Sequence, residues 1–430
     1  MADAQFPQLT DEMLEAARRT ISREEKERPP CFSQMTKDVI RRWAYTIGDA
    51  NPLWLDDEYA NATRWGSILV PPTFPETAVR GPIFNPLRVA RGRARPAQAE
   101  AAARLPGQAA SRGGGFPGLA GLQAGRQFTF YNPVHVNDEL RGMQRVVAIV
   151  DSEGRTAGDC IEDQVDAASA LAGAAEECAA PHTRIALQTF DIKVYSKISG
   201  ALLFRCLHHM ARFARGVTME ESKYRDVPRP YYTDEEMGRI IDAHEQEFLR
   251  GADVLYWEDV AVGDAVPTIV KGPHTPSDYI MYHSAFGSFF DVTDRIKYLL
   301  LKRFPGAAVV DPETNVPEFP HNMHLDGFAA SSMGYPRGFD GSMQRISWFG
   351  HLVTNWMGDD AVLRTLNVFH RRPLFLYDAM WISGRVVAKH EADASVDLEL
   401  WGDNQRGERI SVGSATVALQ SRAGKPFPYR

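Results

Sequence analysis

The sequence has 430 residues, of which 44% are hydrophobic and 24% are charged, and its formal net charge is −7. This length exceeds what one ordinary core supports and predicts two or three domains of a globular protein. The acidic balance excludes nucleic acid as a general partner, because duplex binding requires a basic face.

Nothing in the sequence indicates a membrane segment or an exported protein. No stretch approaches the ~18 consecutive apolar residues that span a bilayer, and the N-terminus, MADAQFPQLTDEMLEAARR, lacks the apolar core of a signal peptide. Four cysteines are scattered without CxxC spacing, at Cys31, Cys160, Cys178 and Cys206. This usage favours reduced thiols over disulfides or a zinc site, so we expect a cytoplasmic protein.

No motif indicates a metal or a nucleotide cofactor. The sequence contains no Walker loop, no HExxH and no GxSxG, and no GxGxxG follows a predicted strand. We therefore expect a protein without a cofactor.

The first clear element is an amphipathic helix from Thr36 to Gly48. Thr36 is a good N-cap and Gly48 a good C-terminal stop. Apolar residues recur on one face of this helix, at Val39, Ile40, Trp43, Ala44 and Ile47.

Two segments of biased composition follow. Residues 88–114 are rich in arginine and residues 157–180 in alanine, and both are expected to be flexible surface loops. The arginine-rich segment has a rival interpretation, in which Arg91 and Arg93 bind the phosphates of a ligand such as coenzyme A. The His208–His209 pair after them is expected to be exposed.

Residues 216–256 are expected to link two halves of the chain. A polar, proline-bearing stretch precedes a helix with a capping box, formed by Thr233 and Glu236. The buried stripe of that helix is expected to comprise Met237, Ile240, Ile241, His244 and Phe248.

The second half then repeats the first. A helix of the same design begins at Thr275, 239 residues after Thr36, and ends at Gly287. PLFLYDAM at 373–380 repeats PVHVNDEL at 133–140 with an offset of 240 residues, and both segments are predicted to be strands.

A third pair consists of WLDDEYA at 54–60 and HLDGFAA at 324–330, with an offset of 270 residues. Extra residues near 290–320 in the second half and near 85–115 in the first account for the change in offset. The repeats predict two copies of one domain: an N-terminal domain at 1–215, a linker with an amphipathic helix at 216–250 and a C-terminal domain at 251–430.

The segment GDANPLWLDDEYA at 48–60 resembles the MaoC-like hydratase signature, Gly-Asp-x-Asn-Pro-x-His-x-Asp. PPTFPE at 71–76 and GLQAGRQFTFYNPVHVNDEL at 121–140 resemble the N-terminal dehydratase domain of fused family members. YWEDVAVGDAVP at 256–267 resembles the opening of their C-terminal copy. The similarity touches most of the chain, from about residue 30 to residue 420.

This resemblance implies an α+β double hot-dog fold, in which each copy has a long central helix wrapped by an antiparallel sheet. It also implies reversible addition of water to a trans-2-enoyl thioester. In this chemistry an aspartate and a histidine share the reacting water. Backbone N–H groups at the start of the central helix stabilise the enolate-like oxygen.

The first copy retains Asp49 and Asn51 but has Trp54 where the family has its histidine. An indole donates one hydrogen bond and cannot shuttle a proton, so a self-contained site here is expected to be inactive. Asp49 is interpreted either as catalytic or as a cap of the following turn. Trp54 is expected to line an acyl pocket.

The second copy retains His324 and Asp326, with Phe319 in place of the family's first aspartate. His324 is interpreted either as the catalytic imidazole or as a structural histidine at a turn. Its carboxylate partner is expected to be Asp326, Glu318 or Asp340.

A helix is predicted at about 342–357, with Met343, Ile346, Val353 and Trp356 packed inward. Just before it, Asp340-Gly341 replaces the His-Gly pair of simpler hydratases. Further site candidates are Arg345, His351 and Asn355, where the alternative for Arg345 and Asn355 is the satisfaction of a buried polar seam.

The sequence therefore predicts an acyl-CoA hydro-lyase, an enoyl-CoA hydratase or 3-hydroxyacyl-CoA dehydratase, for a bulky or branched acyl group. The expected partners are an acyl-CoA or acyl-carrier thioester and further copies of the chain in a homodimer or larger assembly. One alternative is a non-catalytic acyl-CoA-binding subunit of a hetero-oligomeric hydratase, and another is a thioesterase on the same fold.

Overall fold

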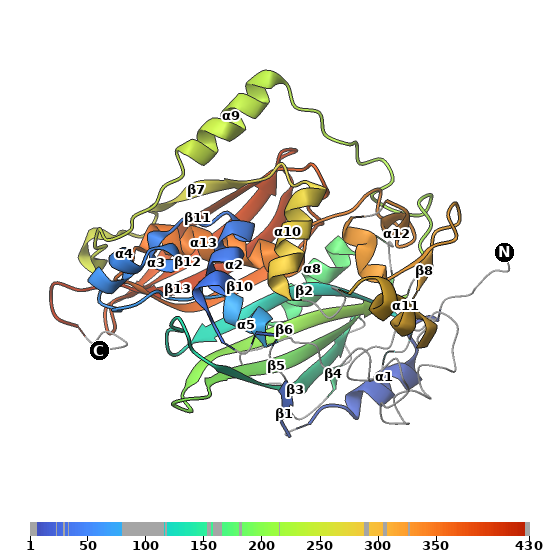
Figure 1. Cartoon of the computed structure of the whole chain (residues 1–430), viewed down its shortest axis with the longest axis horizontal. Coiled ribbons are helices and arrows are strands. Elements are labelled where there is room, and N and C mark those ends of the chain that lie inside the picture. Colours follow the sequence, from blue (N-terminus) through green and yellow to red (C-terminus); the bar gives the residue numbers. More distant parts are fainter. Residues whose placement is uncertain are drawn as a thin grey trace.

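The two halves of the chain meet along one pair of strands. In the computed structural model, β2 (Ala120–Phe130) pairs antiparallel with β10 (Val362–His370), with Thr129 opposite Thr365. Within the described residues this pairing creates an 11-stranded sheet with the order β1-β3-β5-β6-β2-β10-β13-β12-β11-β7 and β4 beside β3 (Figure 1). The first half supplies one side of the sheet and the second half the other.

The structure describes residues 7–22, 24–28, 31–32, 34–79, 116, 118–152, 156–157, 166–179, 183–214, 216–287, 292–303, 308–325 and 327–425. The remaining strands of the large sheet are β1 (Lys26–Arg28), β3 (Leu140–Asp151), β4 (Thr156–Ala157), β5 (Ala186–Ser196), β6 (Leu202–Phe213), β7 (Ala265–Lys271), β11 (Met380–His390), β12 (Ser395–Asn404) and β13 (Arg409–Ala418). A separate hairpin joins β8 (Val309–Val310) to β9 (Pro317–Glu318).

The helices are α1 (Asp11–Arg18), α2 (Lys37–Ile47), α3 (Pro52–Leu55), α4 (Asp57–Ala62), α5 (Phe74–Ala78), α8 (Ala167–Glu177), α9 (Asp234–Glu245), α10 (Pro276–Phe286), α11 (Asp294–Arg303), α12 (Gly327–Ser331) and α13 (Ser342–Met357). Two 3-10 helices cover Trp257–Asp259 and Pro320–His324. Among the described helices, none is long and apolar enough to cross a bilayer.

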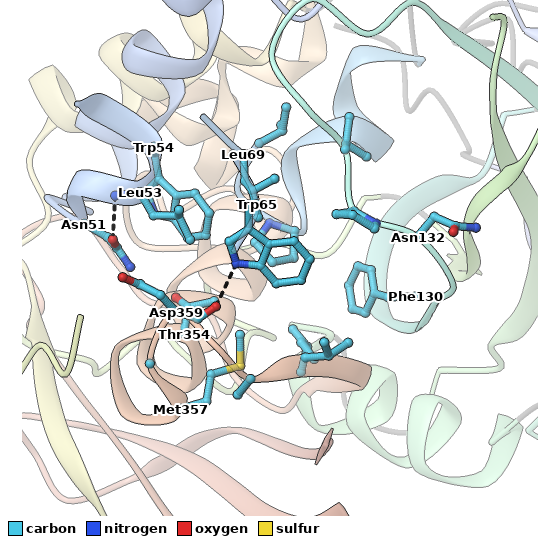
Figure 2. A pocket seen from close by; sticks show the side chains of 18 of the residues that line it. Asn51, Leu53, Trp54, Trp65, Leu69, Phe130, Asn132, Thr354, Met357 and Asp359 are labelled. Carbon is cyan, nitrogen blue, oxygen red and sulfur yellow. Dashed lines mark hydrogen bonds between the residues drawn. The ribbon is translucent and has the colours of Figure 1, made fainter. Parts of the chain in front are cut away.

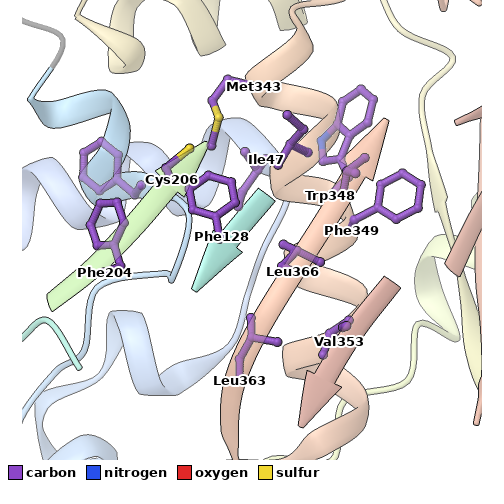
Figure 3. Packing of buried hydrophobic residues seen from close by; sticks show 14 of the residues in the cluster. Ile47, Phe128, Phe204, Cys206, Met343, Trp348, Phe349, Val353, Leu363 and Leu366 are labelled. Atoms are coloured by element: carbon purple, nitrogen blue, oxygen red, sulfur yellow. The ribbon is translucent and has the colours of Figure 1, made fainter. Parts of the chain in front are cut away.

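The helix α13 is the long central helix of the second half, as predicted for residues 342–357. Every residue from Met343 to Met357 is buried, so polar side chains on this helix must find partners inside the protein. The helix packs against β7, β10 and β11 of its own half and against β2 of the other (Figure 1). In Figure 3 its side chains Met343, Trp348, Phe349 and Val353 join a core with residues of both halves.

The internal repeat is present in the structure. Thr36 and Thr275 cap α2 and α10, and Gly48 and Gly287 end these helices with φ angles of 66° and 70°. The two helices pack against each other. The chain is therefore built from two copies of one hot-dog arrangement, and the double hot-dog fold is confirmed.

The predicted strands at 133–140 and 373–380 are wrong, because both segments are loops that precede β3 and β11. Their common feature is a residue in the left-handed region, with φ of 70° at Asn137 and 75° at Tyr377. Such a residue interrupts an extended strand. The repeat itself holds, since the bridge between Leu69 and His135 recurs between Phe339 and Phe375 at offsets of 270 and 240 residues.

The alanine-rich segment is not a loop throughout, because residues 167–177 form α8. Asp166 caps it by accepting the Ser169 N–H at 3.0 Å. Its small residues Ala170, Gly173 and Ala174 are buried where α8 packs against β2 and β10. Alanine favours a helix, and its small side chain allows this close approach to the sheet. The arginine-rich segment, including Arg91 and Arg93, lies outside the described residues.

Two further expectations about burial fail. The capping box of Thr233 and Glu236 is present, but α9 lies at the periphery of the molecule (Figure 1), and of its predicted stripe only Ile240 is buried. The helix covers little of the core because it contacts mainly the edge strand β7.

His208 and His209 are buried rather than exposed, because β6 is an interior strand of the sheet.

Candidate functional site

The signature of the first half forms a tight turn between α2 and α3. The Asn51 N–H donates to Asp49 Oδ1 at 3.0 Å, and the Leu53 N–H donates to Asn51 Oδ1 at 2.9 Å. Both polar side chains are buried, at 3% and 2% exposure. Asn51 therefore caps the short helix α3, and Asp49 holds the backbone of this cap in place.

Trp54 occupies the histidine position of the signature and hydrogen-bonds to Asp49. Its indole Nε1 donates to Asp49 Oδ2 at 2.9 Å, so both carboxylate oxygens of Asp49 accept a hydrogen bond. Because the indole nitrogen has no lone pair to accept a proton, this pair cannot perform the shared acid–base chemistry of an aspartate and a histidine.

A buried polar cluster lies on the far side of Asp49. His351 of α13 accepts at Nδ1 from Lys271 Nζ over 2.7 Å, which places the ring proton on Nε2. His351 Nε2 lies 3.0 Å from Glu247 Oε1 and 3.6 Å from Asp49 Oδ1. Asn355 also contacts His351 and Glu247 through its amide nitrogen. The cluster bridges the two halves.

The charged groups of this cluster shift one another's pKa values. Burial lowers the pKa of Lys271, whereas the carboxylates of Glu247 and Asp49 oppose that shift. Burial alone would raise the pKa of Glu247, but its bonds to His351 and the charge of Lys271 leave the pKa below its usual value. Sequence reasoning missed Lys271 and Glu247, because a single lysine at the end of a strand carries no recognisable motif.

An apolar pocket opens on the other face of Trp54 (Figure 2). It has about 690 Å³ of empty space including its mouth, and both halves contribute to its walls. Its polar lining residues are Asn51, Asn132, Thr354 and Asp359. The apolar lining includes Leu53, Trp54, Trp65, Leu69, Phe130, Val134, Phe204, Met357, Val362 and Leu363. Trp54 therefore lines a pocket, and its contact with an acyl group stays a prediction.

Asp359, just after α13, is the carboxylate of this pocket. The Tyr59 hydroxyl donates to its Oδ2 at 2.5 Å, and the Trp65 indole donates to its backbone oxygen at 2.8 Å. Burial raises the pKa of Asp359, while its contacts with Tyr59 and the Asn51 amide act in the opposite direction. Burial and the neighbouring carboxylate also raise the pKa of Tyr59. Neither residue belongs to a motif that could be recognised in the sequence.

His324 lies at the end of the 3-10 helix that replaces α3 in the second half. Its Nδ1 lies 2.8 Å from the Phe339 carbonyl oxygen, which can only accept, so the ring proton is on Nδ1. The Tyr279 ring stacks on the imidazole at 4.8 Å. Burial lowers the pKa of His324 to about 4, although the Phe339 carbonyl and Asp340 favour the charged form. The ring is therefore neutral at pH 7, with the lone pair on Nε2.

Two of the three expected carboxylate partners of His324 are engaged elsewhere. Asp340 accepts from Arg345 Nε at 2.7 Å, and Glu318 lies 2.5 Å from Lys297 Nζ. Asp326 lies outside the described residues. Across the described parts of the chain, no hydrogen bond joins the His324 ring to a carboxylate.

Arg345 and Asn355 face the interior and are absent from the lining of the pocket. Arg345 is 1% exposed and also donates to the Arg372 carbonyl oxygen at 2.8 Å. More histidines gather near His324, which sequence reasoning did not anticipate: His283 stacks on His321 at 5.2 Å, and buried His274 meets Trp348 edge to face. In the described part of the chain, no group of three or more side chains is arranged to hold a metal ion.

The two candidate sites lie at opposite ends of α13. His324 bonds to Phe339, just before the helix begins, whereas Thr354 and Met357 line the pocket at its end. A helix of this length spans about 24 Å. The pocket at Trp54 and the His324 ring are therefore separated by about the length of α13.

Known dehydratases are similar to this chain in sequence and in structure. A family model described as the FAS1-like dehydratase domain region matches residues 32–168, which include the turn at Asp49. A solved structure of a MaoC-like dehydratase covers 94% of this chain and 100% of its own, with a TM-score of 0.57 and 13% identity. This chain resembles the MaoC-like dehydratases.

Further matches to this chain are more distant or shorter. The structure of a putative MaoC domain protein dehydratase from Chloroflexus aurantiacus J-10-fl covers 93% of this chain and 95% of its own, at 8% identity and a TM-score of 0.48. A UPF0336 protein of Parafrankia sp. (strain EAN1pec) is 42% identical over 53 residues, or 12% of this chain. The match spans 35% of the length of that curated relative.

Proposed function

We propose that this protein is a hydro-lyase that adds water reversibly to a trans-2-enoyl-CoA, with His324 as the acid–base residue. The observation that carries the proposal is the orientation of the His324 ring. Its Nδ1 proton is donated to the Phe339 carbonyl oxygen, so a neutral ring keeps the Nε2 lone pair for a water proton.

The start of α13 supports the second requirement of the reaction. Gly341 precedes the helix, and no side-chain hydrogen bond caps its first turn. The free N–H groups and the positive end of the helix dipole suit a developing enolate oxygen. In this scheme water attacks C3, its proton passes to His324 Nε2, and the imidazolium returns a proton to C2.

The experiment measures loss of the enoyl thioester on mixing the protein with enoyl-CoAs of increasing length. Crotonyl-CoA is the first choice, because Tyr279 and Phe339 pack directly against the His324 ring. His324→Ala is expected to lower its turnover by ~100-fold or more. The matched control is His390→Ala, since His390 is half-exposed and pairs with Asp397. Absence of water addition to any chain length by the unmodified protein would overturn the proposal.

A second candidate function is a non-catalytic acyl-CoA-binding subunit. The observation that favours it is that Phe319, a buried phenyl ring, stands where the family has its first aspartate. Turnover by the purified chain without a partner separates the two functions. Self-association into a homodimer stays a prediction, which sedimentation of the purified chain tests.

A further inference from the structure

The pocket beside Trp54 has the composition of a reaction site rather than of a packing defect. Aromatic and aliphatic side chains form its walls, and one carboxylate and one amide lie together at one end (Figure 2). Such a wall with few convergent polar groups is typical of sites for small apolar ligands. The carboxylate in this pocket is Asp359, and the hydrogen bond between Asp49 and Trp54 does not account for its position.

Asp359 is built into this pocket without being fully satisfied. It is 5% exposed, and among the described residues no hydrogen bond of ordinary geometry reaches its Oδ1 atom, although Tyr59 donates to Oδ2 and the Asn51 amide lies close enough to lower the pKa of the carboxyl. A buried acceptor without a partner costs free energy. The cost is recovered when a ligand or a water bound in the pocket donates a hydrogen bond to this oxygen.

Asn51 completes the polar end of the pocket. Its Oδ1 accepts the Leu53 N–H at 2.9 Å, which fixes the amide so that the NH₂ group faces the pocket beside Asp359 (Figure 2). A fixed amide donor is suited to a thioester oxygen that gains negative charge during the reaction.

We infer that Asp359 replaces the missing histidine as the acid–base residue of a second hydratase site in the first half, for enoyl thioesters with longer apolar chains. This inference rests on the proposed function. A water molecule held by Asp359 forms a bond from its oxygen to C3 and loses a proton to the carboxylate. The double-bond electrons move to the thioester oxygen beside Asn51. C2 then takes the proton from Asp359, which regenerates the carboxylate.

The length of the acyl chain separates this site from His324. Most of the pocket lining is apolar, with Asn132 and Thr354 as its other polar residues, and suits a long chain, whereas Tyr279 and Phe339 crowd the His324 ring. Trans-2-decenoyl-CoA and crotonyl-CoA are therefore used as the two probes. His324→Ala is expected to retain decenoyl-CoA turnover, and Asp359→Asn to lose it by ~100-fold or more while crotonyl-CoA is still hydrated at His324.

A third variant tests the acid–base role. Tyr59→Phe removes the hydrogen bond that holds down the pKa of Asp359, so the acidic limb of the decenoyl-CoA pH profile is expected to move to higher pH. A purely structural Asp359 would leave that limb in place. This shift of the pH profile tests the acid–base role of Asp359 even if Asp359→Asn fails to fold.

Two results overturn the inference while leaving the proposed function intact: decenoyl-CoA turnover that survives Asp359→Asn, and loss of both activities in His324→Ala. Failure of the proposed function looks different, because the unmodified protein then hydrates neither probe.

Discussion

The indole nitrogen of Trp54 donates to Oδ2 of Asp49 at 2.9 Å, so the residue at the histidine position of the MaoC-like signature is bonded to the aspartate of that signature. Both side chains are 3% exposed. Asp49 has a structural role: it caps the turn after α2 and faces the His351–Lys271 cluster. These contacts connect the turn at Asp49 to the second half of the chain.

This bond can be measured by its effect on stability. Trp54→Phe retains an aromatic ring but leaves Oδ2 of buried Asp49 without its donor, and we expect a loss of about 1–3 kcal/mol in the free energy of unfolding. Asp49→Asn and the double variant complete a cycle in denaturant unfolding. A double variant that costs less than the sum of the two single variants shows the coupling. Strict additivity would contradict it.

The Arg345–Asp340 pair is expected to be structural. Burial would raise the pKa of Asp340, but the charge and hydrogen bonds of Arg345 outweigh burial and keep the pKa below its usual value. Arg345→Met leaves an uncompensated buried carboxylate, so we expect a loss of about 3–5 kcal/mol in the free energy of unfolding. The exposed pair of Arg422 and Asp259 provides the control, because Arg422→Met is expected to change stability very little. Equal effects of the two substitutions would argue against this interpretation.

Periodicity and repeats predicted much of the fold. Local sequence patterns were enough to predict the helix caps at Thr36 and Thr275 and the helix at 342–357. The repeat was recognised from matching segments at offsets of 239, 240 and 270 residues. The strands predicted at 133–140 and 373–380 failed, because apolar residues alternate in a buried turn as well as in a strand. One left-handed residue, Asn137 or Tyr377, decides between the two.

The candidate site was less predictable for a different reason. Trp54 was recognised because it sits in a contiguous signature, whereas Asp359, Lys271 and Glu247 reach the first-half turn from distant parts of the chain. Only the pairing of the two halves brings them there. Burial of His208 and His209 likewise depends on β6 being an interior strand, which the sequence of that strand does not reveal.

Burial of His209 predicts a pH dependence of stability. Burial lowers the pKa of His209 to about 4, against a usual value of about 6.5. Below pH 6.5 the unfolded chain binds a proton that the folded chain does not bind until about pH 4. The stabilising contribution is therefore complete above pH 6.5 and is lost as the pH falls towards 4, by about 3 kcal/mol at most.

His209→Gln is expected to flatten that part of the stability curve in denaturant unfolding at pH 7.5 and 4.5. His390→Gln is the control, because the His390 side chain is 48% exposed. An unchanged slope in the His209 variant would show that other groups account for the loss of stability in acid.

Two glycines within helices are expected to respond to alanine with opposite signs. Alanine in a helix interior is normally favoured over glycine by about 1 kcal/mol. At Gly238 in α9, a Cβ atom meets nothing within 4 Å, so Gly238→Ala should stabilise the helix and slow amide hydrogen exchange in α9.

At Gly173 in α8, an added Cβ atom would clash with the backbone oxygen of His370 in β10. Because that oxygen belongs to the sheet and cannot rotate away, Gly173→Ala should cost about 1–3 kcal/mol in the free energy of unfolding despite its better helix propensity. Stabilisation by both substitutions would mean that α8 can move away from β10, and hence that its small residues do not fix the spacing between helix and sheet.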